Sequence, residues 1–429
     1  MIKLILKQII NRKRSNGWII VELLLVFCMV WYIADYLFVL NYNRNIPDYR
    51  DLDHAWKINI GEYPDNHSRY RADENTGEAR EANFGRILRT LRDYSGIEAV
   101  TVLNPYCEPA SNGSLSTGLY RAKDTTRFIT GQQIMIDPRE DFFRVFGYTS
   151  NKGKQSVSTQ DFDVNNPKGI VLSQMYADSL FPESSAVGQE VSFGNGEYYT
   201  VTGVIDDVKR FDYLRPQRMF YLFTYRWRAN NLNEAIIAVR SRASWGKSFA
   251  ESFKKEMRNR LRTGNFYLKS VVPYTRIDTD TKDNAGISND IRIHISLMIF
   301  FLLNILLCVM GTFWHRVNTR WEEIGIRKAV GSSARSIRSI LFAEGLLLLT
   351  FAMLPAMLIE YHFVRAGLIE TLGQNSQNTG MYLPDRTHLR FLITNGITWL
   401  TMAAVIITAI WIPARRAAAL PPAEALHYE

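Results

Sequence analysis

Three acidic residues lie inside apolar stretches of the sequence, where a carboxylate could carry a proton or an ion. They are Glu22, Asp35 and Glu344. A charge near the centre of a lipid bilayer costs about 2.5–3.5 kcal/mol or more, so such residues are candidates for a functional role. Each also has a structural explanation, because Glu22 and Glu344 are close enough to the end of their stretch to reach the membrane interface, and Asp35 is about one helical turn from an end. We favour the structural explanation.

Patterns that mark common catalytic or metal sites do not occur in the sequence. Its seven histidines form no HExxH pair, and there is no G-x-S-x-G turn. Gly246-Lys247-Ser248 resembles the end of a phosphate-binding loop, but the position five residues before Gly246 is Ser241 rather than glycine. We therefore predict no catalytic residue, no metal and no cofactor on this chain.

Four apolar blocks divide the sequence, and the three acids lie within them. Each is about 20 residues long, the length that crosses roughly 30 Å of hydrocarbon as a helix. They cover residues 17–40, 293–314, 340–359 and 391–412. The predicted fold is a membrane protein with four transmembrane α-helices and a large external α+β domain between the first and second helix.

The charges between the blocks predict the orientation. Of a net charge of +9, the segment 1–16 carries five bases and no acid, and the segment 315–339 carries six bases and two acids. Lys and Arg concentrate on the cytoplasmic side, so we place these two segments and the tail 413–429 in the cytoplasm. The segments 41–292 and 360–390 are then external. This asymmetry accounts for the basic surplus without nucleic acid as a partner.

The two longest polar segments carry secondary-structure signals. Residues 1–16 could form a short amphipathic helix on the membrane surface. In the external segment, residues 169–172 and 198–205 read as strands, 174–180 as a short helix and 244–261 as a longer helix. We expect a non-catalytic domain that binds a partner or transmits force.

The cytoplasmic loop between the second and third blocks predicts a short amphipathic helix. Trp321, Ile324 and Lys328 fall on one helical face, and Glu323 precedes Arg327 by four residues. Physical arguments alone favour equally a helix that docks on a cytosolic partner and one that rests on lipid headgroups.

The end of this helix is also marked in the sequence. Gly331 suits a C-terminal cap, and Ser332 or Ser333 can cap the helix that follows.

Several motifs resemble those of one membrane protein family. The stretch 323–333 (EIGIRKAVGSS) and the tail 413–429 are similar to the signature and C-terminus of FtsX-like permeases, the MacB superfamily of ABC transporters. External motifs at 141–147, 169–173 and 201–208 are similar to those of the periplasmic core domain of that family. The resemblance covers nearly the whole chain.

The resemblance implies a function and a set of partners. Such proteins are inner-membrane subunits that form homodimers or heterodimers with a related permease, contact membrane lipid and in some cases a periplasmic adaptor. Their loop between spans two and three is a coupling helix that docks on a cytosolic ABC ATP-binding subunit, which here must be a separate chain that binds ATP and Mg. ATP hydrolysis then moves the periplasmic domain, a process called mechanotransmission.

By position, the resemblance assigns the coupling helix to one short run of residues. The predicted partner-binding residues are Trp321, Glu322, Glu323, Ile324, Gly325, Ile326, Arg327 and Lys328. We expect Trp321 and Ile324 to be the apolar anchors, and Glu323, Arg327 and Lys328 to make polar contacts.

Two other functions fit the same topology. The main alternative is a membrane-anchored sensor whose external domain binds a peptide and signals to a cytosolic kinase. A weaker one is an external hydrolase on a membrane anchor. The cytosolic partner, an ATP-hydrolysing subunit or a kinase, distinguishes the first two.

Overall fold

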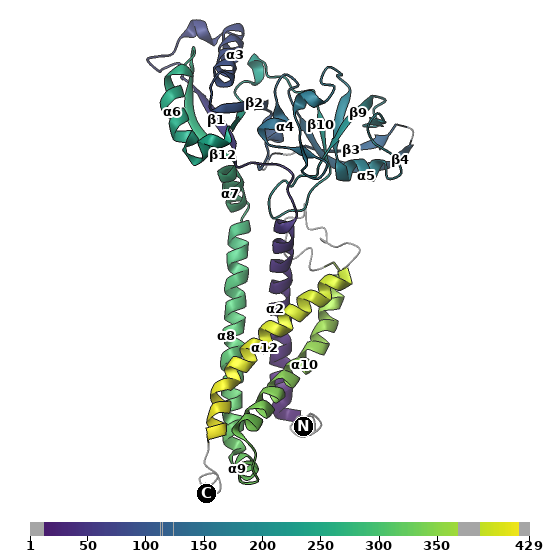
Figure 1. The fold of residues 1–429 in the computed structure, drawn as a ribbon, viewed down its shortest axis with the longest axis vertical. Coiled ribbons are helices and arrows are strands. Elements are labelled where there is room, and N and C mark those ends of the chain that lie inside the picture. Colours follow the sequence, from purple (N-terminus) through teal and green to yellow (C-terminus); the bar gives the residue numbers. More distant parts are fainter. Residues whose placement is uncertain (1–12, 112, 114, 123, 368–386, 420–429) are drawn as a thin grey trace. The chain divides into compact units, whose positions relative to one another are not determined.

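The structure is a computed structural model that describes residues 13–111, 113, 115–122, 124–367 and 387–419. The expected N-terminal amphipathic helix, most of the loop 360–390 and the end of the tail 413–429 lie outside the described residues. The chain divides into two compact units: residues 44–286 form one, and residues 1–43 together with 287–429 form the other (Figure 1).

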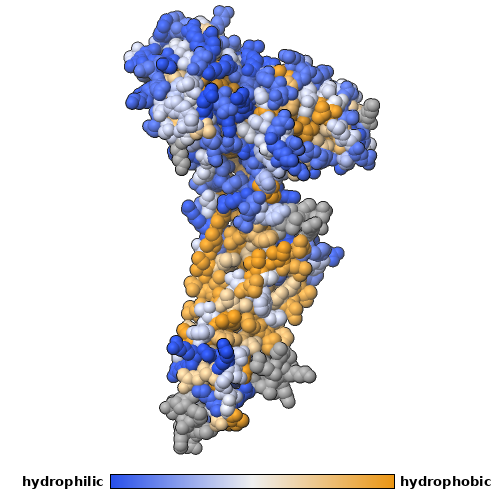
Figure 2. All heavy atoms as spheres, in the orientation of Figure 1, coloured by the Kyte–Doolittle hydropathy of each residue, from blue (hydrophilic) through white to orange (hydrophobic). Residues whose placement is uncertain are grey.

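The second of these units contains four long apolar helices. They are α2 (Lys13–Asn45), α8 (Ile287–Thr319), α10 (Ala334–Arg365) and α12 (Thr387–Ala419). Each is long and apolar enough to cross a membrane. They extend beyond the apolar blocks of the sequence because polar flanking residues continue the helix into the interface region, where hydropathy no longer marks it. Figure 2 shows that the apolar surface lies over these helices.

One core holds the four helices together. Phe27 and Val30 of α2, Leu349 of α10 and Ile410 of α12 are fully buried in it. A Cβ on Gly345 would lie 2.4 Å from the side chain of Ile410, so glycine at this position lets α10 and α12 approach closely.

The unit of residues 44–286 begins with an antiparallel sheet covered by two helices. The strand order is β12 (Phe266–Pro273), β1 (Ala55–Glu62), β11 (Ile236–Ser241) and β2 (Ile97–Leu103). The helices α3 (Gly77–Arg92) and α6 (Phe249–Arg260) pack on one face. Period-two alternation explains this layer, because Ile237 and Val239 face the helices while Ala238 faces the opposite side.

A small closed barrel forms the other half of this unit. Its strands, in order, are β10 (Met219–Leu222), β4 (Asp124–Met135), β3 (Leu115–Arg121), β8 (Glu190–Ser192), β9 (Tyr198–Ile205) and β7 (Gly169–Ser173). The helix α5 (Gln174–Leu180) follows β7 and packs on the barrel. The two predicted strands and the short helix in this region are confirmed.

The remaining elements of this unit are shorter. They are α4 (Phe142–Val145), α7 (Tyr274–Asn284), the hairpin strands β5 (Thr149–Ser150) and β6 (Gln155–Ser156), and 3-10 turns at Ala72–Asn75, Pro105–Cys107, Thr159–Asp161, Ala229–Asn231 and Ala243–Ser248.

The predicted helix 244–261 is wrong at its start. Gly246 has φ +47°, a left-handed conformation that interrupts the helical turn, and α6 begins only at Phe249.

The fold class is confirmed, because the structure has four candidate membrane helices and an α+β unit inserted between the first and the second.

Aromatic side chains in and directly after α4 fill the space between the sheet and the barrel. Phe142, Phe143 and Phe146 are buried against Ala238 of the sheet and Tyr221 of the barrel.

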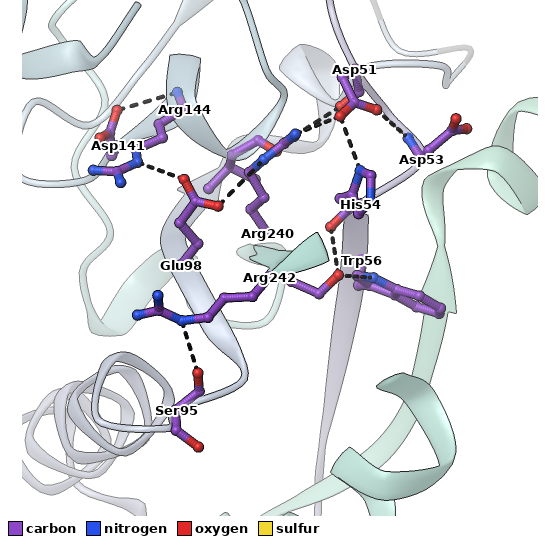
Figure 3. Close-up of polar contacts among 12 residues, drawn as sticks. Asp51, Asp53, His54, Trp56, Ser95, Glu98, Asp141, Arg144, Arg240 and Arg242 are labelled. Atoms are coloured by element: carbon purple, nitrogen blue, oxygen red, sulfur yellow. Dashed lines mark hydrogen bonds and ion pairs between the residues drawn. The ribbon is translucent and has the colours of Figure 1, made fainter. Parts of the chain in front are cut away.

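An ion-pair cluster marks the same junction (Figure 3). The guanidinium of Arg240 on β11 contacts the Asp51 carboxylate at 2.5 Å and lies 3.9 Å from Glu98 of β2. Glu98 also accepts a hydrogen bond from Arg144 of α4 at 3.0 Å, and His54 lies 3.0 Å from Asp51. The cluster therefore fixes the chain that follows α2 against both the sheet and α4.

The electrostatics of Asp51 generate a prediction about acid stability. Burial would raise the pKa of Asp51, but hydrogen bonds from Arg240 and His54 outweigh it and hold the pKa below its ordinary value. A lowered pKa contributes stability that is present above the unfolded value, about 3.9 for Asp, and is lost as the pH falls through the folded value. We expect Asp51→Asn to make the domain less stable near pH 6 and to remove part of the loss of stability in acid.

Urea unfolding of a fragment of residues 46–285 between pH 6 and pH 3 tests this. The matched control is Asp53→Asn, because Asp53 is exposed and its carboxylate points away from Arg240. Equal pH profiles for the two variants would contradict the assignment.

Candidate functional site

The predicted cytoplasmic helix is present as α9 (Trp321–Ala329). Arg320 separates it from α8 with non-helical backbone angles (φ −114°, ψ 22°). Acidic residues occupy its first turn and basic residues its last, which complements the helix dipole. The expected pair is formed, with Arg327 Nη2 at 2.6 Å from Glu323 Oε1.

The end of α9 follows the sequence signals. Gly331 has φ +96°, in the left-handed region where glycine is favoured. Ser333, one of the two expected caps, accepts a hydrogen bond from the Ser336 N–H at 3.2 Å and begins α10. Together these two residues turn the chain from α9 back into the membrane helix.

The faces of α9 differ from the expected arrangement of anchors. Ile324 is only 7% exposed and packs in the core of the four helices, and Trp321 is partly buried against the same core. Ile326 and Val330 are 53% and 83% exposed. The two side chains expected to anchor a partner are thus turned toward the chain's own bundle, and the outward apolar positions are Ile326 and Val330.

A buried ion cluster fixes this helix to the bundle. Glu344 of α10 contacts Arg316 Nη1 at 2.5 Å and Arg320 Nη1 at 2.9 Å. Arg316 also donates a hydrogen bond to Asn16 of α2. Glu344 is 1% exposed, so the expectation that it reaches the membrane interface is wrong. We call Asn16, Arg316, Arg320 and Glu344 the inner ion cluster; it joins α2, α8, the start of α9 and α10.

The other two intramembrane acids also have partners within the bundle. Asp35 is 2% exposed and forms a bidentate ion pair with Arg390 of α12, with Arg390 Nε at 2.9 Å from Oδ1. Glu22 accepts a hydrogen bond from Cys308 Sγ at 2.8 Å. Hydropathy could not reveal these partners, because each comes from a different helix.

A fourth acid lies in the bundle, although hydropathy does not mark it. Hydropathy assigns Glu360 to the external loop 360–390, but the residue lies within α10 and is 1% exposed. The apolar block ends at residue 359, while the helix continues to Arg365 and turns Glu360 inward.

A second group of charges lies where the external unit leads toward the membrane helices. Asp212 contacts Arg44, near the end of α2, at 3.5 Å and Lys282 of α7 at 3.2 Å. Lys282 also contacts Asp278 at 2.7 Å, and Lys209 Nζ donates to the backbone oxygen of Arg44 at 3.2 Å. We call these five residues the outer clasp.

Burial perturbs two groups of the outer clasp. It raises the pKa of Asp278, an effect that Lys282 offsets only in part. It lowers the pKa of Lys209, and the nearby Asp48 and Asp212 oppose this shift. Sequence patterns do not reveal this clasp, because its members come from three distant segments.

Two acids that precede Lys209 in the sequence, Asp206 and Asp207, have structural roles in the external unit. Asp206 accepts hydrogen bonds from the N–H groups of Lys152 and Gly153 at 2.8 and 2.7 Å, and Asp207 accepts one from the Met175 N–H at the start of α5. These two acids therefore hold a turn and a helix end.

Comparison with known proteins agrees with this architecture. The chain matches the MacB-like periplasmic core domain over residues 39–256 and the FtsX-like permease C-terminal domain over residues 295–422. It therefore belongs to the FtsX-like permeases of the MacB type. Proteins of this family are permease subunits of ABC transporters and are generally non-catalytic, and this chain is a permease subunit of a bacterial membrane.

Solved structures similar to the chain come from several bacteria. The periplasmic region of MacB from Actinobacillus actinomycetemcomitans is 16% identical, with coverage of 54% of this chain and 94% of that one and a TM-score of 0.30. A domain of a putative permease protein from Porphyromonas gingivalis is 13% identical (53% and 96% covered, TM-score 0.31). The extracellular domain of the noncanonic ABC-type transporter YknZ from Gram-positive bacteria is 14% identical (50% and 100% covered, TM-score 0.27). No curated protein matches the chain.

The inner ion cluster generates a stability prediction. Removing one partner of a buried ion pair costs about 3–5 kcal/mol, whereas an exposed pair contributes about 0–1 kcal/mol. We expect Glu344→Gln to lower the thermal unfolding temperature of the detergent-solubilised protein strongly, because two buried guanidinium groups lose their carboxylate. Glu323→Gln, which breaks the half-exposed pair in α9, is the control. Equal shifts for the two variants would show that the cluster does not stabilise the bundle.

Proposed function

We propose that this permease subunit couples ATP hydrolysis by a separate cytosolic ATP-binding subunit to movement of its external domain. The observation that carries the proposal is the position of α9. One side of this helix is fixed to the bundle, while Ile326 and Val330 stay exposed on a segment that the charge distribution places in the cytoplasm.

The layout of α9 favours docking on a partner subunit over contact with lipid headgroups alone. Its inner apolar side chains already pack within the chain's own core. A partner subunit with an apolar groove could therefore take Ile326 and Val330 without disrupting that packing, while Glu323, Arg327 and Lys328 supply polar contacts around them. ATP and Mg would be bound by the partner.

The proposed route for movement starts at the inner ion cluster. Arg320 lies at the junction of α8 and α9, and Glu344 holds it to α10, so a displacement of α9 would be transmitted to both helices. At its other end α8 is preceded by α7, which carries Lys282 and Asp278 of the outer clasp. Asp212 lies in the loop between β9 and β10 of the barrel, and it contacts Lys282 of α7 and Arg44 near the end of α2.

The proposal includes the setting of the protein. Both termini are cytoplasmic and the membrane is the inner membrane, as the positive flanks support. The subunit works as a homodimer or as a heterodimer with a related permease. Exposed apolar side chains on α8, including Ile293, Phe300 and Leu303, support contact with lipid and with a second permease chain. A periplasmic adaptor is a further proposed partner.

The docking step has a direct test. We expect Ile326→Ser combined with Val330→Ser to weaken co-purification with the co-expressed ATP-binding subunit by roughly tenfold or more, since two exposed apolar anchors would be lost. The unfolding temperature of the permease should change little. The comparator is Ile324→Ser, which should lower the unfolding temperature because the residue is buried. Undiminished co-purification of the double variant would rule out docking through this face.

The transmission step needs a separate measurement. Spin labels at Glu251 on α6 and Glu197 beside β9, both exposed, report the arrangement of the sheet and the barrel. In the complex with its ATPase we expect ATP binding to change this distance, and Asp212→Asn to reduce the change while ATP hydrolysis continues. Asp280→Asn, which breaks an exposed pair on α7, is the matched control. An unreduced change in Asp212→Asn would place the route elsewhere.

A further inference from the structure

Glu360, in the outer half of the membrane bundle, is an acid without an ion-pair partner among the described residues. Glu360 of α10 is 1% exposed, and its carboxyl faces the Asn395 amide and the Cys28 thiol. Neither of its oxygens is in hydrogen-bonding geometry with a donor among the described residues. This differs from Glu344 and Asp35, each of which contacts arginine.

Buried oxygen atoms around Glu360 lack hydrogen bonds in the described part of the chain. Asn395 Nδ2 donates to the Phe391 carbonyl at 3.0 Å, and Asn395 Oδ1 is buried with no partner in the described part of the chain. The side chain of Cys28 offers only a weak S–H donor. In the part of the chain that the structure describes, the two carboxyl oxygens of Glu360 and the amide oxygen of Asn395 are therefore buried without a hydrogen bond in normal geometry.

The surrounding charges are already balanced. Asp35 on α2 and Arg390 on α12 neutralise each other through their bidentate pair. An ionised Glu360 would add a negative charge to this apolar region, which is costly because a buried carboxylate loses its hydration. A proton on Glu360 removes that charge and supplies the missing donor to Asn395 Oδ1.

We propose that Glu360 is a proton-binding site inside the membrane bundle. When the proton is bound, the neutral carboxyl donates a hydrogen bond to Asn395 and holds α10 against α12. When the proton leaves to bulk water, the carboxylate gains a full charge and α10 loosens from α2 and α12 at their outer ends. The packing of the outer half of the bundle thereby depends on pH, and this inference is independent of the proposed ATPase partner.

Infrared spectroscopy of the full-length protein in lipid nanodiscs tests proton occupancy directly. A neutral carboxyl gives a C=O stretching band that is separate from the carboxylate bands. We expect wild type to show this band at neutral pH and to lose it as the pH rises, and Glu360→Gln to lack it. Glu22→Gln, which changes an intramembrane acid hydrogen-bonded to Cys308, should keep the band. A full band in Glu360→Gln would overturn the proposal.

A second variant examines the hydrogen bond. Asn395→Leu removes the acceptor, so the carboxyl band should move to higher frequency, as expected for a C=O group whose O–H is no longer hydrogen-bonded. An unchanged band position would show that Asn395 does not accept from Glu360 and would overturn this part of the proposal.

The pH dependence of unfolding provides an independent readout. Glu360 stabilises the fold only while protonated, so the unfolding temperature of wild type should fall as the pH rises from 5 to 9, and Glu360→Gln should lose most of this fall. The control is His388→Gln on α12, which removes a ring stacked on Tyr361 at 6.3 Å and leaves Glu360 in place. This variant should keep the slope of wild type. Parallel slopes for wild type and Glu360→Gln would overturn the proposal.

Discussion

Burial of charge in a low-dielectric interior is the constraint on which the membrane unit depends. Glu344 is almost completely buried, and two guanidinium groups face its carboxyl group. Without these partners, burial of the charge would be costly. Arg316 and Arg320 are held by the same carboxylate, so neither can move away alone without leaving a charge unpaired. The ends of α8 and α10 that adjoin α9, together with the start of α9, are therefore obliged to move as one body.

The two ends of α10 are built differently. Glu344 and Glu360 are separated by 16 positions, which corresponds to about 24 Å along the helix, so they lie in opposite halves of the membrane. At the end next to α9, Glu344 is held by two ion pairs. At the other end the ion pair is formed by Asp35 and Arg390, and Glu360 has no charged partner among the residues that the structure describes. Rigid packing is thus concentrated at the inner end, while the outer end can respond to a single proton.

Much of the architecture could be predicted from the sequence because it depends on local patterns. Four long apolar blocks indicate four helices, alternation indicates strands, and Ser333 caps a helix within a few residues of its own position. Partners of buried acids depend on tertiary packing instead. Asp35 and Arg390 are 355 positions apart, and nothing in either neighbourhood indicates the other. Hydropathy does not reveal Glu360, because the apolar block ends at residue 359 while the helix continues to Arg365.

Periodicity alone does not show which apolar face of α9 is buried. A helix of nine residues with apolar positions at 321, 324 and 326, followed by Val330, has two apolar faces, and the sequence does not say which one is already used. Packing decides this, because Ile324 joins the core and Ile326 does not. A docking helix must keep one face for its own protein if it is to transmit force, since a helix held only by its partner would move without moving the bundle. In α9 the inward face and the inner ion cluster meet that requirement, and the outward face is the one that we propose for the partner.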